Sequence, residues 1–378
     1  MSQAPRKPTS KRKRRIWLAL ALAMVCALVG CRSAGFYGQA VHGQWRLLAD
    51  RKPIKSLLES SNTPPTLREK LRLVQSLREF AGRDLGLPIE GHYVSYVDVG
   101  REHVVWNVKA APEFSLEAHA WWYPVLGRLK YRGYFAEADA RACAAKLQAQ
   151  GFDTHVGGVD AYSTLGWFKD PVINTFIDYE APELAGVIIH ELAHQKLFVG
   201  GDSDFDEAFA MAVEQEGVKR WLKTTGRMAM LEQYERSLRR ELEFQNSLEQ
   251  TREELRKLYQ GPVALKVVQG QGTAADLALL RAAKQAAFAR LKERHAELRV
   301  QWDGDTHRSR WVTNQINNAK LASESTYHRL LPAFLKLLAQ HRGDLNAFYA
   351  AAKTLSKMPA ADREREMNRL LNQGVAAE

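Results

Sequence analysis

Residues 190–194 read His-Glu-Leu-Ala-His and lie in an apolar run, residues 187–198, whose pattern predicts a buried helix. Side chains four positions apart on a helix lie one above the other on the same face. The imidazoles of His190 and His194 can therefore reach one metal ion, and Glu191 can act on water held there, as in a zinc peptidase. The alternative is that hydrogen bonds to backbone or carboxylate groups satisfy both imidazoles, because histidines buried without partners are costly.

A catalytic zinc ion usually has three protein ligands and one position left for water. We expect the third ligand downstream, on a helix that packs against the first. Twelve residues separate His194 from Glu207, and Glu214 follows seven positions later. Positions seven apart lie on the same side of a helix, so both carboxylates should face the histidines.

These two motifs resemble those of the gluzincin metallopeptidases. The segment Asp206-Glu207-Ala208-Phe209-Ala210 is similar to the Asn-Glu-Gly-Phe-Ala motif of aminopeptidase N-type enzymes, in which a second Glu also follows seven residues later. The resemblance implies that Glu207 is the third zinc ligand. The alternative for Glu207 is a capping-box contact with Asp204. Glu214 is the alternative third ligand, although we favour a carboxylate that orients a histidine.

A wider resemblance extends over nearly the whole chain after residue 30, to a bacterial family of predicted aminopeptidases, many of them lipoproteins. It rests on the two motifs and on further segments: Tyr37-Gly38-Gln39, Gln44, Arg51-Lys52-Pro53-Ile54, Asn317-Asn318-Ala319, Tyr327 and Pro332-Ala333-Phe334. Two features depart from aminopeptidase N. The interval between His194 and Glu207 is shorter, and the Gly-x-Met-Glu-Asn motif that binds the substrate's free amine is absent from the sequence.

The predicted function is zinc-dependent hydrolysis of peptides, with aminopeptidase activity implied by the resemblance. His190, His194 and Glu207 would hold one Zn²⁺ per chain, and Glu191 would be the general base. Gluzincins often use a downstream tyrosine to stabilise the oxyanion, and Tyr327 is the candidate; its alternative role is an aromatic that packs between helices. Two other functions stay open: an endopeptidase with the same zinc chemistry, and a non-catalytic, zinc-stabilised envelope scaffold.

The amino terminus resembles a lipoprotein signal peptide. The chain contains 54 Lys and Arg against 43 Asp and Glu, and seven of the basic residues lie within residues 6–15. An apolar segment follows and ends in Leu28-Val29-Gly30-Cys31, which is similar to a lipobox. We expect lipidation of Cys31, a membrane anchor and a periplasm-facing protein of the cell envelope. Arg32 favours the outer membrane; the alternative is an uncleaved signal anchor.

Outside residues 1–30 the chain is close to neutral, with 47 basic against 43 acidic residues, and this excludes nucleic acid as a partner. The expected partners are peptide substrates and, through Cys31, the membrane.

The predicted fold is α+β, predominantly helical and zincin-like. A small mixed or antiparallel sheet is expected mainly from residues 92–180, with strands that include Phe114–Ala120 and Tyr131–Phe135. Long charged helices over residues 228–259 and 274–298, joined by a loop, predict an antiparallel helical hairpin. The predicted regions are a signal peptide (1–30), a helical segment (31–87), a catalytic core (88–225), the hairpin (226–300) and a helical region (301–378).

Overall fold

The computed structural model describes residues 36, 38–123, 127–161 and 169–372, and for residues 325–328 it describes the backbone only. The chain divides into two compact units, residues 1–50 and residues 51–378. In the first unit, residues 38–49 are helical. Cys31 lies outside the described residues. Among the helices described, none has the length and apolar character needed to cross a membrane.

Helices dominate the second unit. They are α2 (Ile54–Glu59), α3 (Pro65–Arg83), α4 (Glu137–Gln148), α5 (Asn174–Ile177), α6 (Ala181–Lys196), α7 (Ser203–Thr224), α8 (Met228–Gln260), α9 (Pro262–Val268), α10 (Ala274–Gln301), α11 (Ser309–Thr313), α12 (Asn318–His328), α13 (Leu331–Gln340), α14 (Leu345–Ser356) and α15 (Ala360–Asn372). The strands are β1 (Lys52–Pro53), β2 (Ser95–Val97), β3 (Val105–Pro112), β4 (Trp121–Tyr123), β5 (Gly127–Leu129), β6 (Arg132–Tyr134), β7 (Phe152–Val159) and β8 (Val172–Ile173). This composition confirms the predicted, predominantly helical α+β class.

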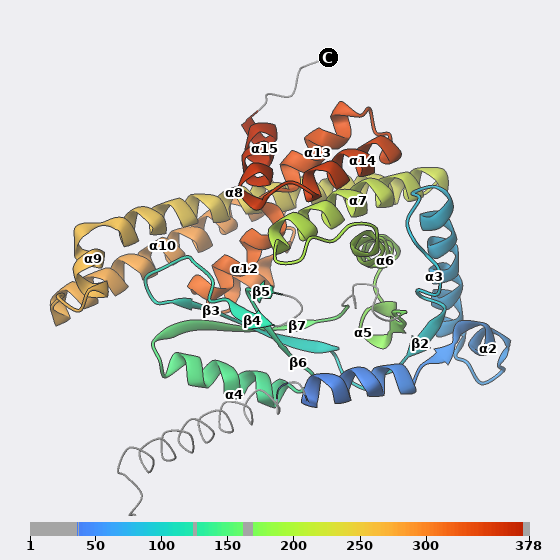
Figure 1. Cartoon of the computed structure of the whole chain (residues 1–378), viewed down its shortest axis with the longest axis horizontal. Coiled ribbons are helices and arrows are strands. Elements are labelled where there is room, and N and C mark those ends of the chain that lie inside the picture. Colours follow the sequence, from blue (N-terminus) through green and yellow to red (C-terminus); the bar gives the residue numbers. More distant parts are fainter. Residues whose placement is uncertain (1–35, 37, 124–126, 162–168, 373–378) are drawn as a thin grey trace, which may run out of the picture. The chain divides into compact units, whose positions relative to one another are not determined.

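The largest sheet is antiparallel, with the strand order β6-β3-β7. Side chains alternate between its two faces. Val108 of β3 packs with Ala140 and Ala144 of α4, so helix α4 covers one face. Helix α12 lies against β3 and β7 on the other side of the sheet (Figure 1). Asn107 and Lys109, the neighbours of Val108 in β3, therefore face away from α4.

A second, mixed sheet consists of short strands in the order β1-β2-β8. Strand β2 runs antiparallel to β1 and parallel to β8. Strand β8 leads through α5 into α6. Strands β4 and β5 form a separate antiparallel pair. The segment Phe114–Ala120, predicted as a strand, is irregular, so that prediction is wrong. Glu113 binds Arg281 there, and Glu117 N donates to Ser115 Oγ, so a local turn replaces the expected ladder.

Helices α6 and α7 pack directly against one another (Figure 1). Gly217 of α7 makes the close approach possible, because a Cβ there would meet Ile189 of α6 at 3.0 Å and Leu85 at 2.8 Å. On its other side α7 buries Phe209, which stacks on Phe348 with ring centroids 5.7 Å apart. These apolar contacts fix α7 between α6 and the carboxyl-terminal helices.

Helices α8 and α10 pack along one another, joined through α9 (Figure 1). Their contact surface is apolar and includes Phe244, Leu248, Phe288 and Leu291. The connecting segment was expected to be a loop, but Pro262 occupies the first turn of α9, where its missing N–H costs nothing. The region boundaries predicted after residues 87, 225 and 300 remain predictions.

Candidate metal centre

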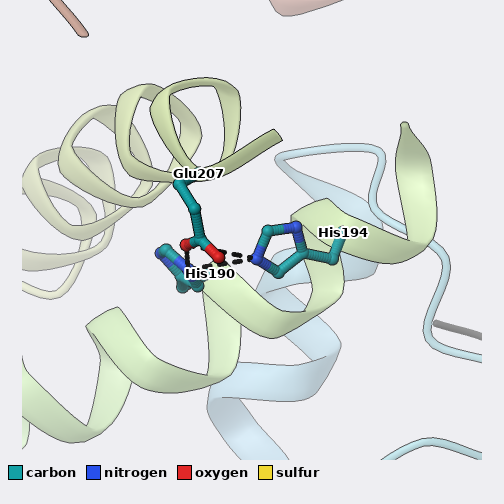
Figure 2. A group of neighbouring side chains, drawn as sticks. All are labelled: His190, His194 and Glu207. Carbon is teal, nitrogen blue, oxygen red and sulfur yellow. Dashed lines mark hydrogen bonds and ion pairs between the residues drawn. The ribbon is translucent and has the colours of Figure 1, made fainter. Parts of the chain in front are cut away.

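Helix α6 brings the two histidines of the motif together. It begins at Ala181 with Pro182 in its first turn, and its apolar side chains are buried in the core. The Nε2 atoms of His190 and His194 lie 3.2 Å apart (Figure 2). Both rings are largely withdrawn from solvent, with side chains 13% and 9% exposed. Two nitrogen donors thus converge on one point, as the four-residue spacing requires.

Helix α7 supplies the third side chain. Oε2 of Glu207 lies 3.3 Å from Nε2 of His190 and 3.7 Å from Nε2 of His194 (Figure 2). The N-cap of α7 is Asp202, whose side chain accepts a hydrogen bond from Phe205 N. The capping-box alternative for Glu207 is therefore not what the structure shows, and the carboxylate of Glu207 is directed at the histidines.

The three donor atoms fit a tetrahedral metal ion. Donors about 2.0–2.1 Å from a tetrahedral zinc ion lie about 3.3–3.4 Å from one another. The distances between donors in this group are 3.2, 3.3 and 3.7 Å. Among the described residues, His190, His194 and Glu207 form the group of side chains whose ligand atoms lie close enough together to hold one metal ion. Two imidazoles and one carboxylate are ligands that suit zinc.

Glu214 lies behind His190, on the opposite side of the ring from Glu207. His190 Nδ1 donates to Oε2 of Glu214 at 3.0 Å, which leaves Nε2 directed at Glu207 and His194. Gly186, one turn earlier on α6, provides the room, because a Cβ at this position would lie 3.1 Å from Glu214 Oε1. Glu214 is placed to fix the orientation and tautomer of His190 rather than to complete the donor group.

The charges of the centre are strongly coupled. Burial by itself would lower the pKa of His190, but the carboxylates of Glu207 and Glu214 outweigh it and raise this pKa well above the ordinary value. Burial would likewise raise the pKa of Glu207, but hydrogen bonds to the two histidines hold it well below its usual range. The carboxylate of Glu207 is therefore anionic at every physiological pH.

Glu191 differs from the other carboxylates of the centre. It stands beside His190 on α6 and is half-buried. Burial raises its pKa above the ordinary glutamate value, and the neighbouring histidines only partly oppose the shift. A carboxylate with a raised pKa, next to a metal centre and outside the donor group, has the properties of a general base.

The short connection between α6 and α7 is fixed by carboxylates. Asp206 accepts a hydrogen bond from Val199 N at 2.7 Å, and Asp202 forms an ion pair with Arg363 at 2.8 Å. Asp204 binds Lys130 at 2.9 Å and Arg329 at 3.3 Å. These contacts hold the first turn of α7, and they explain how twelve residues suffice to bring Glu207 back to His194.

The sheet contributes side chains that the sequence motifs did not reveal. Lys109 of β3 lies opposite His155 of β7, and continuing the β3–β6 register by one residue brings Tyr131 to its other side. We call Tyr131, Lys109 and His155 the polar row. Glu207 acts electrostatically on both Tyr131 and Lys109, and Glu191 also acts on Tyr131. The period-2 alternation around Val108 was the signal that could have placed Lys109 on this face.

Tyr93 is a second aromatic neighbour of the centre. It is buried, and burial, followed by the charges of Glu191 and Asp170, raises its pKa well above the ordinary value. Its φ of 55° lies in the left-handed region, which is uncommon for a bulky residue. The backbone N of Tyr93 donates to Asp170 O at 2.8 Å and holds this conformation. Tyr327 lies on α12, but its side chain is outside the described residues.

Residues 35–367 match the family model described as "Putative aminopeptidase". The chain belongs to this family. The match takes in helices α6 and α7 and the polar row of this aminopeptidase family member. No curated protein and no solved structure matches the chain significantly.

Proposed function

We propose that the protein is a zinc-dependent peptidase of the gluzincin type. The observation that carries the proposal is the convergence of His190 Nε2, His194 Nε2 and a Glu207 carboxylate oxygen within 4.8 Å of one another. Membership of the aminopeptidase family supports the assignment to peptide hydrolysis. The order of ligands, two from the His-Glu-x-x-His helix and one from the next helix beside a small sheet, supports a zincin-like fold.

Zinc held by His190, His194 and Glu207 would supply a Lewis acid that polarises the scissile carbonyl and acidifies a water molecule. Glu191 then takes the proton from the attacking water and delivers it to the leaving amine. Glu214 keeps the Nε2 atom of His190 directed into the centre.

The oxyanion that forms on the scissile carbonyl needs a hydrogen-bond donor from the protein. Burial raises the pKa of Tyr131 to about 12, so its phenol is protonated at neutral pH and can donate. We propose Tyr131 for this role, beside the candidate Tyr327 from the sequence. The two residues are distinguishable by substitution.

A non-catalytic zinc scaffold is a weaker explanation for the same residues. A structural zinc site has no use for a carboxylate that stands beside the donors and neither joins them nor holds one of them in place. Glu191 is such a carboxylate. Because its pKa is raised in the folded protein, its ionised form destabilises the fold at neutral pH. Its presence is explained by catalysis.

The direct test is the zinc content of the purified full chain together with its activity on a panel of aminoacyl and internally quenched peptides. We expect about one zinc per chain and hydrolysis that a chelator abolishes and zinc restores. Glu207→Ala should lose the metal, while Glu216→Ala, on the same helix, should keep it. Stoichiometric zinc in Glu207→Ala would contradict the ligand assignment. Hydrolysis of the aminoacyl substrates indicates an aminopeptidase, and hydrolysis of the blocked internal ones indicates an endopeptidase.

We also propose that the protein is a lipoprotein of the cell envelope, anchored through Cys31 and facing the periplasm from the outer membrane. The proposal rests on the basic segment, the apolar segment and the Leu-Val-Gly-Cys sequence at residues 28–31. Metabolic labelling with a radioactive fatty acid should mark the wild-type chain and leave Cys31→Ser unlabelled. Labelling of both to the same extent would contradict it.

A further inference from the structure

A groove runs along helix α8, apart from the candidate metal centre. Its volume is about 850 Å³, which lies within the range of small-molecule binding sites. From Glu235 to Arg256 it follows 21 residue steps of α8, or about 31 Å at 1.5 Å per residue. Its other walls come from α7, α12, α13 and the segment after β3, and none of the three metal donors is among the described residues that line it. The groove is long enough for an extended ligand.

Apolar side chains from four parts of the chain line the groove. They are Leu116, Leu238, Leu242, Ala322, Leu331, Pro332 and Leu335. Leu242 is 57% exposed, although other apolar side chains line the same groove, and such an exposed apolar surface is typical of a binding site. The backbone groups of α7, α8 and α13 are bonded within these helices, so a peptide laid along them would find few partners for its own N–H and C=O groups. An acyl chain needs no such partners.

The groove also carries an excess of positive charge. Among the described residues that line it, five are basic, namely Lys219, Arg239, Arg252, Arg256 and Arg329, and three are acidic, namely Glu235, Glu241 and Glu249. Ion pairs neutralise most of these charges: Arg252 with Glu249 at 3.2 Å, Arg256 with Glu253, Arg329 with Asp204 at 3.3 Å, and Glu241 with Arg308 at 2.7 Å.

Three charged side chains of the groove remain. Lys219, Arg239 and Glu235 form no ion pair with any described residue. Lys219 belongs to α7 and Arg239 to α8, and these two helices pack together (Figure 1). Two cations against one carboxylate leave a single positive charge. Because lysine and arginine form strong charge-assisted hydrogen bonds with carboxylates, this part of the groove is complementary to a ligand with one negative charge.

We propose that this groove binds a fatty acid. Lys219 and Arg239 bind its carboxylate, and Leu238, Leu242 and Leu335 contact its acyl chain. The unpaired positive charge accounts for the anionic head group, and the apolar walls account for the chain. Since the metal donors do not line the groove, the inference does not depend on the proposed peptidase function.

Isothermal titration calorimetry of the purified full chain tests the class of ligand. The probes are decanoate, decanol, which has the same chain with an uncharged head, and butyrate, which has the same head on a short chain. We expect one decanoate to bind per chain, about 10- to 100-fold more tightly than decanol, the usual effect of hydrogen bonds between charged groups. Butyrate should not bind at the same concentrations. Equal affinities for decanoate and decanol, or no binding of decanoate, would overturn the proposal.

A double variant tests the site of the carboxylate. Lys219→Met combined with Arg239→Met should weaken decanoate binding about 10- to 100-fold and leave decanol binding unchanged. The matched control combines Lys223→Met with Arg236→Met, which removes the same charges from the same two helices at positions that do not line the groove. An equal loss in both double variants would reflect the overall charge alone and would contradict the proposed site.

A single variant tests the site of the acyl chain. Leu242→Asn should weaken the binding of decanoate and decanol alike by about tenfold or more, because a buried apolar contact is lost. Leu242 is exposed in the free protein, so the substitution should leave the fold intact. Leu279→Asn is the control, since Leu279 is 62% exposed on α10 and does not line the groove. Unchanged binding in Leu242→Asn, or an equal loss in Leu279→Asn, would show that the chain binds elsewhere.

Discussion

His190 donates from Nδ1 to the carboxylate of Glu214 at 3.0 Å, while its Nε2 atom faces Glu207 and His194. The imidazole of His190 is thus held by a carboxylate of α7, the same helix that carries the proposed ligand Glu207. Such an outer hydrogen bond fixes the ring and raises its basicity as a ligand. Its removal is therefore expected to weaken the metal centre without touching any metal ligand.

Gly186→Ala should lower the zinc affinity about 10- to 100-fold, the usual effect of disturbing an outer-shell carboxylate. The new Cβ would lie 3.1 Å from Glu214 Oε1, so the carboxylate must shift and the hydrogen bond that its Oε2 accepts from His190 is disturbed. Competition with a fluorescent chelator measures the affinity. Gly38→Ala is the control, because a Cβ at that helical position meets nothing within 4 Å. Equal affinities in the two variants would contradict the role of Glu214.

Glu191→Gln should reduce kcat about 10²- to 10⁴-fold, the contribution typical of a general base. Glutamine keeps the shape of the side chain but cannot accept the proton. Zinc content should be unchanged, because Glu191 stands outside the donor group. Glu183→Gln, exposed in the first turn of the same helix, should leave kcat at the wild-type value. Undiminished turnover in Glu191→Gln would remove Glu191 from its proposed role.

Tyr131→Phe should lower kcat about 10²- to 10³-fold with little change in zinc content, as loss of one oxyanion donor does elsewhere. The phenol of Tyr131 is an electrostatic neighbour of both Glu191 and Glu207. Tyr327→Phe, assayed in parallel, provides the comparison. A loss confined to Tyr327→Phe would assign the oxyanion contact to the downstream tyrosine and leave Tyr131 in a packing role.

Glu241→Gln should lower the free energy of unfolding at pH 7, and this loss should shrink gradually as the pH falls below about 4.5 towards the depressed pKa of Glu241. Burial would raise the pKa of Glu241, but hydrogen bonds from His307 and Arg308 hold it well below the ordinary value of 4.5. A depressed pKa in the folded state stabilises the protein above the unfolded-state value, and this contribution is lost as the pH falls. The difference between variant and wild type should therefore shrink from about pH 5 downward.

Urea unfolding at a series of pH values measures this difference. Glu232→Gln is the control on the same helix. Glu232 also forms an ion pair, with Arg236, but its side chain is 71% exposed, so the pair contributes little to stability. It should change the unfolding free energy little at any pH. A pH-independent effect of Glu241→Gln would show that its partners do not depress the pKa.

The helical part of the candidate centre could be predicted from the sequence because its geometry is local. His190 and His194 share one helix, so the four-residue spacing fixes their relation. The relation of Glu207 to Glu214 follows in the same way. What periodicity could not supply is the distance between α6 and α7. That distance depends on Gly217 meeting Ile189 and on the contacts of Asp202 and Asp206 in the connection.

The sheet side of the centre was beyond sequence reasoning because strand register is non-local. Lys109 becomes a neighbour of Glu207 only through the pairing of β3 with β7 and the packing of α12 over the sheet. Two predictions were wrong because local contacts favoured another structure. The contacts of Glu113 and Ser115 replaced a predicted strand with a turn, and Pro262 began a helix, α9, in a predicted loop.

The close crossing of α6 and α7 at Gly217 bears on how the protein would acquire the proposed zinc ion. Buried apolar packing holds α6 and α7 together at this crossing. We therefore expect the demetallated chain to remain folded, with its binding cage preorganised, unlike a zinc finger that collapses on chelation. Reconstitution would then be fast and reversible, and the supply of zinc in its compartment could set the fraction of active molecules.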